Sequence, residues 1–388
     1  MEYIIQAFTG GYKSKSPWTP REVLTRISSV MDILPVRSVI IGWNGRTELY
    51  YPLIDEVHRR GKKIFAWLPV FSEMSAFDEA FRAVDFAGAS HGGAKVSGDD
   101  DFLFLCPSRR QNIELAIRVY KDCFAKSDFD GIFLDKIRYA SFGNGFNAAM
   151  GCFCGECRRE YQKRGIDHEK IIALLGGEEK PFLSPAALEG MRYRFDDPLI
   201  DGFFRARADI ISSSVFELTD WFKGRGLAVG LDVYAPVFAY YVGQDISALS
   251  QKADFIKPMM YRITDAPAGV PYEHRRMRQE LGACGCGIDG RLEGLWGVDD
   301  ICGDSAFRAQ AEGLKQARCE INIGIEVNDK PGICVSDGAY AAGTIDMIDK
   351  SGLGCVLSWD VLSAPEATLR AIAEHNAIYG GIADEPAE

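Results

Sequence analysis

Short apolar segments alternate along the chain with longer stretches in which apolar residues recur every three or four positions. Short apolar runs are typical of buried parallel strands, whereas the longer spacing is typical of amphipathic helices. Residues 21–34 (REVLTRISSVMDIL) and 52–61 (PLIDEVHRRG) show the helical pattern, and Gly61 stands where glycine commonly ends a helix. We predict eight strands, over residues 3–8, 38–43, 63–70, 131–139, 227–236, 254–261, 320–328 and 354–362.

This eightfold alternation predicts an α/β protein of the (β/α)₈ TIM-barrel class. A doubly wound sheet would require a glycine-rich phosphate turn after the first strand, and TGGYKSKS (9–16) lacks the spacing for one. Long insertions are predicted after strands four and six, the first a Cys-containing segment at about 140–225 and the second over roughly 261–319. We expect residues 1–380 to form a single barrel domain and 381–388 a flexible tail.

Acidic and aromatic residues stand where most of these strands end. In FDGIFLDKIRY (129–139) an apolar run stops at Asp135, whose carboxylate is costly to desolvate. The C-terminal ends of parallel barrel strands meet at one face, so we expect these residues to share one mouth. Aromatic rings stack on sugars, and two carboxyl groups act as acid and nucleophile or base at a glycosidic bond.

This inventory predicts a glycoside hydrolase. Asp135 is the principal catalytic candidate, with Asp232 or Glu326 as its partner. An acid just past a strand also commonly serves as a cap or an ion-pair partner, and this is the favoured use of Asp360. The substrate-binding candidates are Trp43, Trp67, Arg138, Tyr139, Tyr234, Tyr261, Trp359 and Asp360.

A cysteine motif follows the fourth predicted strand. Cys152, Cys154 and Cys157 have a C-x-C-x-x-C spacing that brings three thiolates within reach of one metal ion, and Cys106 is the candidate fourth ligand. Four thiolates form a closed, structural zinc site. Free or buried thiols and a [4Fe–4S] cluster are the alternatives, although the spacing differs from that of radical S-adenosylmethionine enzymes. The pair in GACGCG (282–287) is a weaker metal candidate.

The charge and composition of the chain restrict the classes of partner that it could bind. The chain has 44 Lys and Arg against 55 Asp and Glu, a formal net charge of −11, which argues against nucleic acid and an anionic membrane surface as partners. A small neutral or cationic substrate fits this balance better. None of the five histidines ends a predicted strand, which disfavours a metal-dependent hydrolase, and no G-x-S-x-G elbow occurs.

The opening sequence MEYIIQAF carries neither the basic region nor the apolar core of a secretory signal. No stretch approaches the roughly 20 apolar residues that span a bilayer. Eleven cysteines, several of them in apolar runs, make a full disulfide framework improbable. We therefore expect a cytoplasmic protein that acts on an imported oligosaccharide or glycoside, with no organic cofactor.

The chain resembles uncharacterised bacterial glycosyl-hydrolase-like (β/α)₈ families. The resemblance rests on FDGIFLDKIRY (129–139), CFCGEC (152–157) and VGQDISALSQKADFIKPMMY (242–261), and it covers roughly residues 100–265. It implies a barrel fold and a glycosidase activity.

The cysteine arrangement is similar to that of family-42 β-galactosidases, which bind zinc through a Cys before strand four and a C-x-C-x-x-C after it. That resemblance implies an acid/base role for Asp135 and a nucleophile role for Glu326, although Leu134-Asp135 stands where that family has Asn-Glu. In other barrel glycosidases a strand-four Asp works with an acid on strand five, here Asp232. FDGIFLD also resembles the chitinase signature, but the catalytic Glu of that pattern would fall at Ile137.

Two other functions stay open at this point. One is a non-catalytic barrel that binds a saccharide or a partner protein, and the other is a barrel enzyme of another class, such as a lyase or isomerase. Homo-oligomerisation is likewise left open by the sequence.

Overall fold

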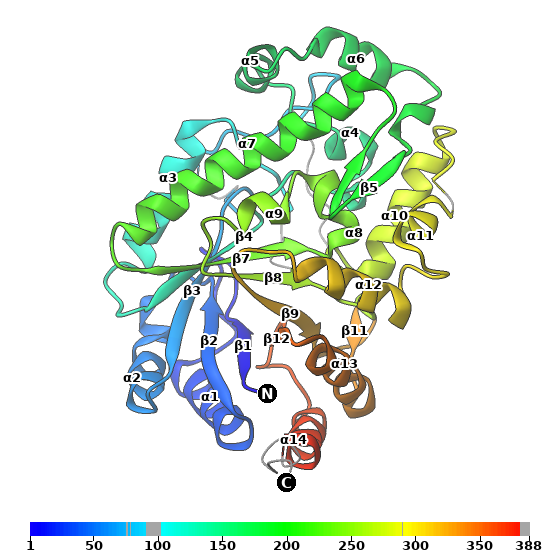
Figure 1. The fold of residues 1–388 in the computed structure, drawn as a ribbon. Helices are drawn as coiled ribbons and strands as arrows, with labels where there is room; N and C mark the ends of the chain where they lie inside the picture. Colours follow the sequence, from blue (N-terminus) through cyan, green and yellow to red (C-terminus); the bar gives the residue numbers. More distant parts are fainter. Residues whose placement is uncertain (75–76, 78, 91–101, 289, 381–388) are drawn as a thin grey trace.

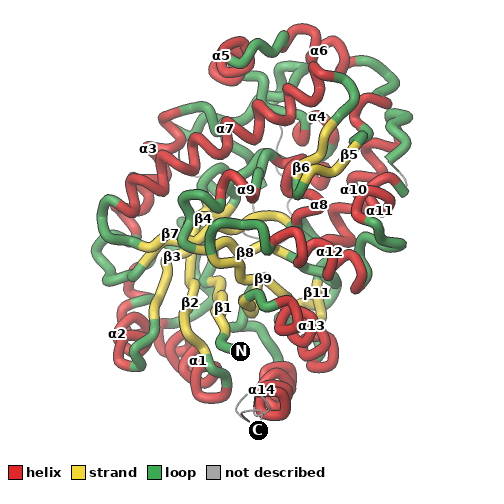
Figure 2. Tube along the Cα trace, viewed as in Figure 1, coloured by secondary structure: helices red, strands yellow, loops and turns green. Residues whose placement is uncertain are grey.

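The computed structural model describes residues 1–74, 77, 79–90, 102–288 and 290–380. Its centre is a closed barrel of eight parallel strands (Figures 1 and 2), so the predicted TIM-barrel class is confirmed. The first and last strands pair with each other, with Tyr3 opposite Cys355, and the sheet therefore has no open edge. Around the barrel the strands are β1 (Tyr3–Phe8), β2 (Val36–Gly42), β3 (Lys63–Pro69), β4 (Gly131–Asp135), β7 (Ala228–Tyr234), β8 (Phe255–Met259), β9 (Glu320–Glu326) and β12 (Gly354–Ser358).

Each predicted segment overlaps one barrel strand, but several strands end earlier than predicted. The difference is four residues at both β4 and β12; β4 was predicted to reach residue 139 and ends at Asp135. Lys136 has a positive φ of 51°, which turns the backbone out of the extended conformation, and pairing with β7 stops at Leu134 opposite Leu231. The polar residues that follow therefore belong to a loop above the barrel.

Helices cover the outside of the barrel (Figures 1 and 2). The two helices predicted over 21–34 and 52–61 are present, and the first begins with a capping box between Thr19 and Glu22. The second ends just before Gly61, which has a φ of 68°. In chain order, these helices are α1 (Pro20–Ile33), α2 (Tyr51–Arg59), α3 (Arg110–Cys123), α7 (Pro198–Lys223), α10 (Val270–Gly282), α11 (Arg291–Trp296), α12 (Asp304–Leu314), α13 (Gly338–Ser351) and α14 (Glu366–Gly380).

Further small elements lie between β4 and α7 and gather at the top of Figure 1, near the N-terminal end of α7. A long segment also separates β3 from α3, over residues 70–109, and the hydrophobic pattern gave no sign of it. None of the described helices combines the length and apolar character that crossing a bilayer requires. The small elements are η1 (Thr47–Leu49), η2 (Phe142–Asn144), α4 (Phe146–Ala149), α5 (Gly155–Lys163), α6 (His168–Gly176), η3 (Pro181–Leu183), β5 (Ala187–Glu189), β6 (Arg192–Arg194), α8 (Pro236–Ala239), η4 (Tyr240–Val242), α9 (Ile246–Leu249), β10 (Asp329–Lys330) and β11 (Cys334–Val335).

A layer of three phenylalanine rings fills part of the barrel interior. Phe255 of β8 stacks on Phe133 of β4 with ring centroids 5.8 Å apart, and meets Phe65 of β3 edge-on at 5.3 Å. Two glycines make room for these rings. A Cβ on Gly131 would lie 2.4 Å from the Phe65 ring, and one on Gly230 would lie 2.2 Å from Phe255.

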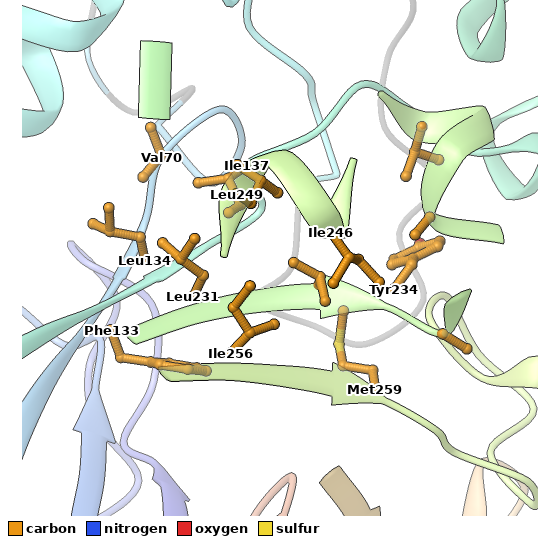
Figure 3. Packing of buried hydrophobic residues seen from close by; sticks show 14 of the residues in the cluster. Val70, Phe133, Leu134, Ile137, Leu231, Tyr234, Ile246, Leu249, Ile256 and Met259 are labelled. Carbon is orange, nitrogen blue, oxygen red and sulfur yellow. The ribbon is translucent and has the colours of Figure 1, made fainter. Parts of the chain in front are cut away.

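On the outer face of the same strands, aliphatic side chains form a second packed layer. Figure 3 shows Leu134, Leu231 and Ile256 extending from β4, β7 and β8 toward Ile246 and Leu249 of α9. All five side chains are buried. Removing such groups from water stabilises the fold by roughly 1.5–3 kcal/mol for each full side chain. The strands are thus fixed on both faces.

We expect Gly230→Ala to destabilise the protein by about 1–3 kcal/mol, because the added methyl group overpacks the phenylalanine layer. Gly343→Ala is the matched control. Gly343 is exposed within α13 with open space around its Cα, so alanine there should stabilise the helix by about 0.5–1 kcal/mol. Urea unfolding of both variants measures the difference, and equal stability of the two would contradict the packing account.

Candidate active site

The barrel interior becomes polar directly above the phenylalanine layer. Side chains alternate along a strand, so the position two residues after an inward residue also faces inward. On four adjacent strands this next position holds a carboxylate, an ammonium or an indole group. The pairs, in strand order, are Phe65 and Trp67 on β3, Phe133 and Asp135 on β4, Gly230 and Asp232 on β7, and Phe255 and Lys257 on β8.

A cavity of about 120 Å³ opens above these residues. Most of the predicted site residues line it, and they come from six strands or the loops that follow them. The cavity is also lined by residues that sequence reasoning missed: Gln6, Phe102, Lys136, Met259, Thr264, 266–268 and Ile333. The predicted residues that line it are Trp43, Trp67, Asp135, Arg138, Asp232, Tyr234, Tyr261 and Trp359.

Asp135 is held by two N–H donors. The indole Nε1 of Trp67 donates to its Oδ2 at 2.9 Å, and the backbone N–H of Lys136 donates to its Oδ1. Hydrogen bonds of this kind stabilise the ionised form of a carboxylate. The local turn that ends β4 therefore also supplies one of the donors to its terminal Asp.

Asp232 lies in a buried pair with Lys257. The Lys257 ammonium donates to Asp232 Oδ2 at 3.0 Å and to Gln6 Oε1 at 2.7 Å. Burial raises the pKa of Asp232 to about 7; the Lys257 charge opposes this rise and the Asp135 charge adds to it. Burial also lowers the pKa of Lys257, against the pull of Asp232. Burial thus disfavours the charged form of both side chains, and their mutual attraction opposes this effect.

Several buried polar atoms around the cavity lack a hydrogen-bond partner within the described part of the chain. They are Asp232 Oδ1, Gln6 Nε2, Trp43 Nε1 and the Tyr261 hydroxyl, and all four residues line the cavity. Buried polar groups normally have a hydrogen-bond partner, and a buried group without one costs about 1–3 kcal/mol of stability. One acceptor, two donors and one hydroxyl therefore border the cavity without a hydrogen-bond partner.

Indole rings form one wall. The rings of Trp43 and Trp67 meet edge-to-face with centroids 4.7 Å apart, and Phe8 packs against Trp43 at 4.8 Å. Trp359 stands beyond β12 on the same cavity, with the Lys330 ammonium 4.1 Å from its ring centroid. This wall offers flat apolar surface next to the polar atoms.

Three predicted site residues do not line the cavity. The Tyr139 ring instead contacts the Arg207 guanidinium of α7 at 4.5 Å. Asp360 accepts hydrogen bonds from the backbone N–H groups of Phe8 and Leu362, at 3.2 and 3.1 Å. It thus serves as a turn cap, the use that the sequence favoured.

Glu326 is the third. Its Oε1 accepts from the backbone of Ile263 and from both the N–H and the hydroxyl of Thr264, and its Oε2 accepts from Tyr340 at 2.6 Å. Burial raises its pKa. With every oxygen engaged, this carboxylate fixes the loop after β8 and is not directed to a ligand.

Lys136 and Phe102 come from loops that carry no periodic pattern. Lys136 pairs with the carboxylate of Glu73, and its ammonium lies 4.2 Å from the Phe102 ring centroid and 5.1 Å from that of Trp43. Lys136 was visible as a charge directly after Asp135, but nothing in the sequence linked Glu73 to it. The segment after β3 thus contributes to the cavity.

The four predicted cysteine ligands converge. The sulfur atoms of Cys106, Cys152, Cys154 and Cys157 all lie within 4.8 Å of one another, and Cys106 Sγ is 3.4 Å from Cys154 and 3.5 Å from Cys157. A tetrahedral site with metal–sulfur bonds of about 2.3 Å places its sulfurs about 3.8 Å apart. Hydrogen bonds from Cys106 and Cys152 hold the pKa of Cys154 well below its usual range. The cluster could therefore hold a metal ion.

Comparison with known proteins identifies structural relatives only. No protein-family model and no curated protein matches the sequence. The glycoside hydrolase domain of PgaB (BpsB) from Bordetella bronchiseptica is similar with a TM-score of 0.61 at 16% identity, over 97% of this chain and 98% of that one. α-L-Fucosidase isoenzyme 2 from Paenibacillus thiaminolyticus is similar with a TM-score of 0.53 at 14% identity, over 98% of this chain. This chain spans about half (49%) of the fucosidase. At these identities the likeness shows the barrel fold.

We expect the purified protein to hold about one metal ion per chain, and Cys106→Ser to lose it, because three thiolates bind far less tightly than four. Cys319→Ser is the control, since Cys319 lies outside the cluster. Inductively coupled plasma mass spectrometry of protein prepared without chelator gives the stoichiometry. Equal metal content in Cys106→Ser and wild type would contradict the assignment.

Proposed function

We propose that this protein is a glycoside hydrolase whose catalytic pair is Asp135 and Asp232. The observation that carries the proposal is the meeting of two carboxylates with unpartnered polar atoms in one aromatic-walled cavity. The two acids follow Leu134 and Leu231, which lie opposite each other on paired strands. Parallel neighbours are about 4.8 Å apart, so both carboxyl groups can reach a single glycosidic bond.

The environments of the two acids suggest different roles. Asp232, with a pKa of about 7 and a free Oδ1, is suited to carry a proton at neutral pH and to deliver it to the leaving-group oxygen. Asp135, which accepts two N–H hydrogen bonds, would take the second role. It would attack the anomeric carbon directly or take a proton from the attacking water. The family-42 resemblance implied the acid role for Asp135, whereas this assignment gives that role to Asp232.

Sugar binding would use the remaining groups of the cavity. The rings of Trp43, Trp67 and Trp359 present flat faces of the kind on which the C–H faces of a pyranose stack. Gln6 Nε2 and Trp43 Nε1 are free donors for sugar hydroxyls. A polyhydroxylated ligand would thus satisfy atoms that the protein leaves unpaired.

We propose that the metal ion at the cysteine cluster is zinc in a structural role. Four thiolates around Zn²⁺ leave no open coordination position and carry a net charge of about −2. Arg207 of α7 is fully buried, donates to the carbonyl of Ala149 at 2.6 Å, and has two nitrogens without partners. No carboxylate pairs with it among the described residues. Burial lowers the pKa of Arg207, and this is opposed by the charges of Tyr161 and Tyr139 and then of Cys157 and Cys152. A negatively charged metal–thiolate centre would supply the missing counter-charge.

We expect Asp135→Asn and Asp232→Asn each to lower kcat by about 10²- to 10⁴-fold, because each removes a group that transfers a proton or bonds to the sugar. Asp360→Asn is the control, as its side chain caps a turn outside the cavity. The assay is hydrolysis of a panel of aryl α- and β-glycosides, with circular dichroism to check folding.

Proton NMR of the first sugar released from an active substrate distinguishes retention from inversion. Wild-type-like rates in both Asn variants would refute the catalytic pair.

The pH dependence tests the role of Asp232. If Asp232 must carry a proton, kcat/KM falls as pH rises above about 7. Because the Lys257 charge lowers the pKa of Asp232, Lys257→Met should move this limb to higher pH. The pH profiles of wild type and variant give the comparison, and an unmoved limb would remove Asp232 from the acid role.

A further inference from the structure

Arg138 lines the cavity, and one edge of its guanidinium has no hydrogen-bond partner among the described residues. The residue is 3% exposed, lies three positions after Asp135 and lines the cavity. Its guanidinium carbon is 4.2 Å from the ring centroid of Tyr234 and 4.5 Å from that of Phe104. These two ring contacts hold the guanidinium in place beside the cavity.

One edge of Arg138 is used and the other is open. Nη1 donates to the backbone carbonyl of Tyr139 at 2.9 Å. Nε and Nη2 make no hydrogen bond within the described part of the chain, and neither is among the fully buried nitrogens. The N–H groups of Nε and Nη2 point the same way and form a two-pronged donor that matches the two oxygens of a carboxylate.

The two neighbouring ammonium groups each have a carboxyl partner. Lys136 pairs with Glu73, and Lys257 pairs with Asp232. Arg138, by contrast, forms no ion pair with any residue that the structure describes. A guanidinium that lines the cavity, forms no ion pair and keeps a free donor edge is placed to bind an anionic group of a ligand.

We infer that the sugar recognised in this cavity carries a carboxylate, and that Arg138 binds it through Nε and Nη2; the substrate class is then a glycoside of a uronic acid. This inference rests on the proposed glycosidase function and specifies its substrate. It departs from the neutral or cationic substrate that the overall charge of −11 suggested. The whole-chain charge is spread over the surface, whereas specificity depends on the charges in the cavity.

Matched aryl glycosides test the inference. The probes are 4-nitrophenyl glucuronides and galacturonides with the corresponding glucosides and galactosides, in both anomeric forms. We expect wild type to prefer one uronide over its neutral partner by about 10- to 100-fold in kcat/KM, the range for a charge-assisted hydrogen-bonded pair. Arg138→Gln should bring this ratio close to one. Arg138→Lys, which keeps the charge but loses the two-pronged donor, should give an intermediate ratio.

The control is Arg262→Gln. Arg262 pairs with Asp304, does not line the cavity, and should leave the uronide preference unchanged. Calorimetric titration of folded wild type and Arg138→Gln with D-glucuronate, D-galacturonate and the neutral sugars measures recognition without catalysis. Thermal melting confirms that the Arg138 variants are folded.

The outcomes separate the inference from the proposed function. Hydrolysis of neutral glycosides as fast as uronides, or a preference that survives in Arg138→Gln, overturns the inference and leaves the hydrolase intact. Arg138-dependent uronate binding without hydrolysis of any glycoside supports the inference and overturns the hydrolase. Absence of uronate binding, or a preference for a matching 6-phosphoglycoside, overturns the carboxylate assignment.

Discussion

Because all eight strands of the barrel run parallel and the sheet closes through the pairing of β1 with β12, every strand ends at the same rim. This constraint brings together side chains that are far apart in the sequence. Gln6, Asp135, Asp232 and Lys257 become neighbours only because four strands occupy fixed places around one ring. An open sheet with the same strands would leave their ends in a row, and the two acids would not share a closed cavity with the indole wall.

Desolvation gives the two acids different properties. Asp135 and Asp232 occupy equivalent positions on paired strands, yet one faces N–H donors and the other faces a buried ammonium. Burial favours the protonated form of a carboxyl group, and this raises the pKa of Asp232. Arg138 lines the same cavity and forms no ion pair with any described residue. The cavity therefore brings two carboxyl groups and a guanidinium together within one small volume.

The barrel class, its eight strands and a rim that holds Asp135 with Asp232 or Glu326 as its candidate partner could be predicted, because buried parallel strands leave a clear apolar pattern and their last residues share a rim. Lys257 could not, since a single lysine inside an apolar run gives no sign of which side it faces. Glu73 lies in a segment without periodicity. Glu326 stood at a strand end like Asp135, but the sequence does not reveal that nearby backbone and hydroxyl donors occupy its oxygens.

The cysteine cluster has a consequence for how this cavity can vary. Cys106 lies at the end of the segment that follows β3, and Cys152–Cys157 lie in the segment that follows β4. These two segments also supply Phe102 and Arg138 to the cavity. A metal ion bound by these cysteines would tie the far ends of the two segments to each other. A designer could then replace the segment after β3 and the segment after β4 together, and alter ligand selectivity while the strands and the acids stay unchanged.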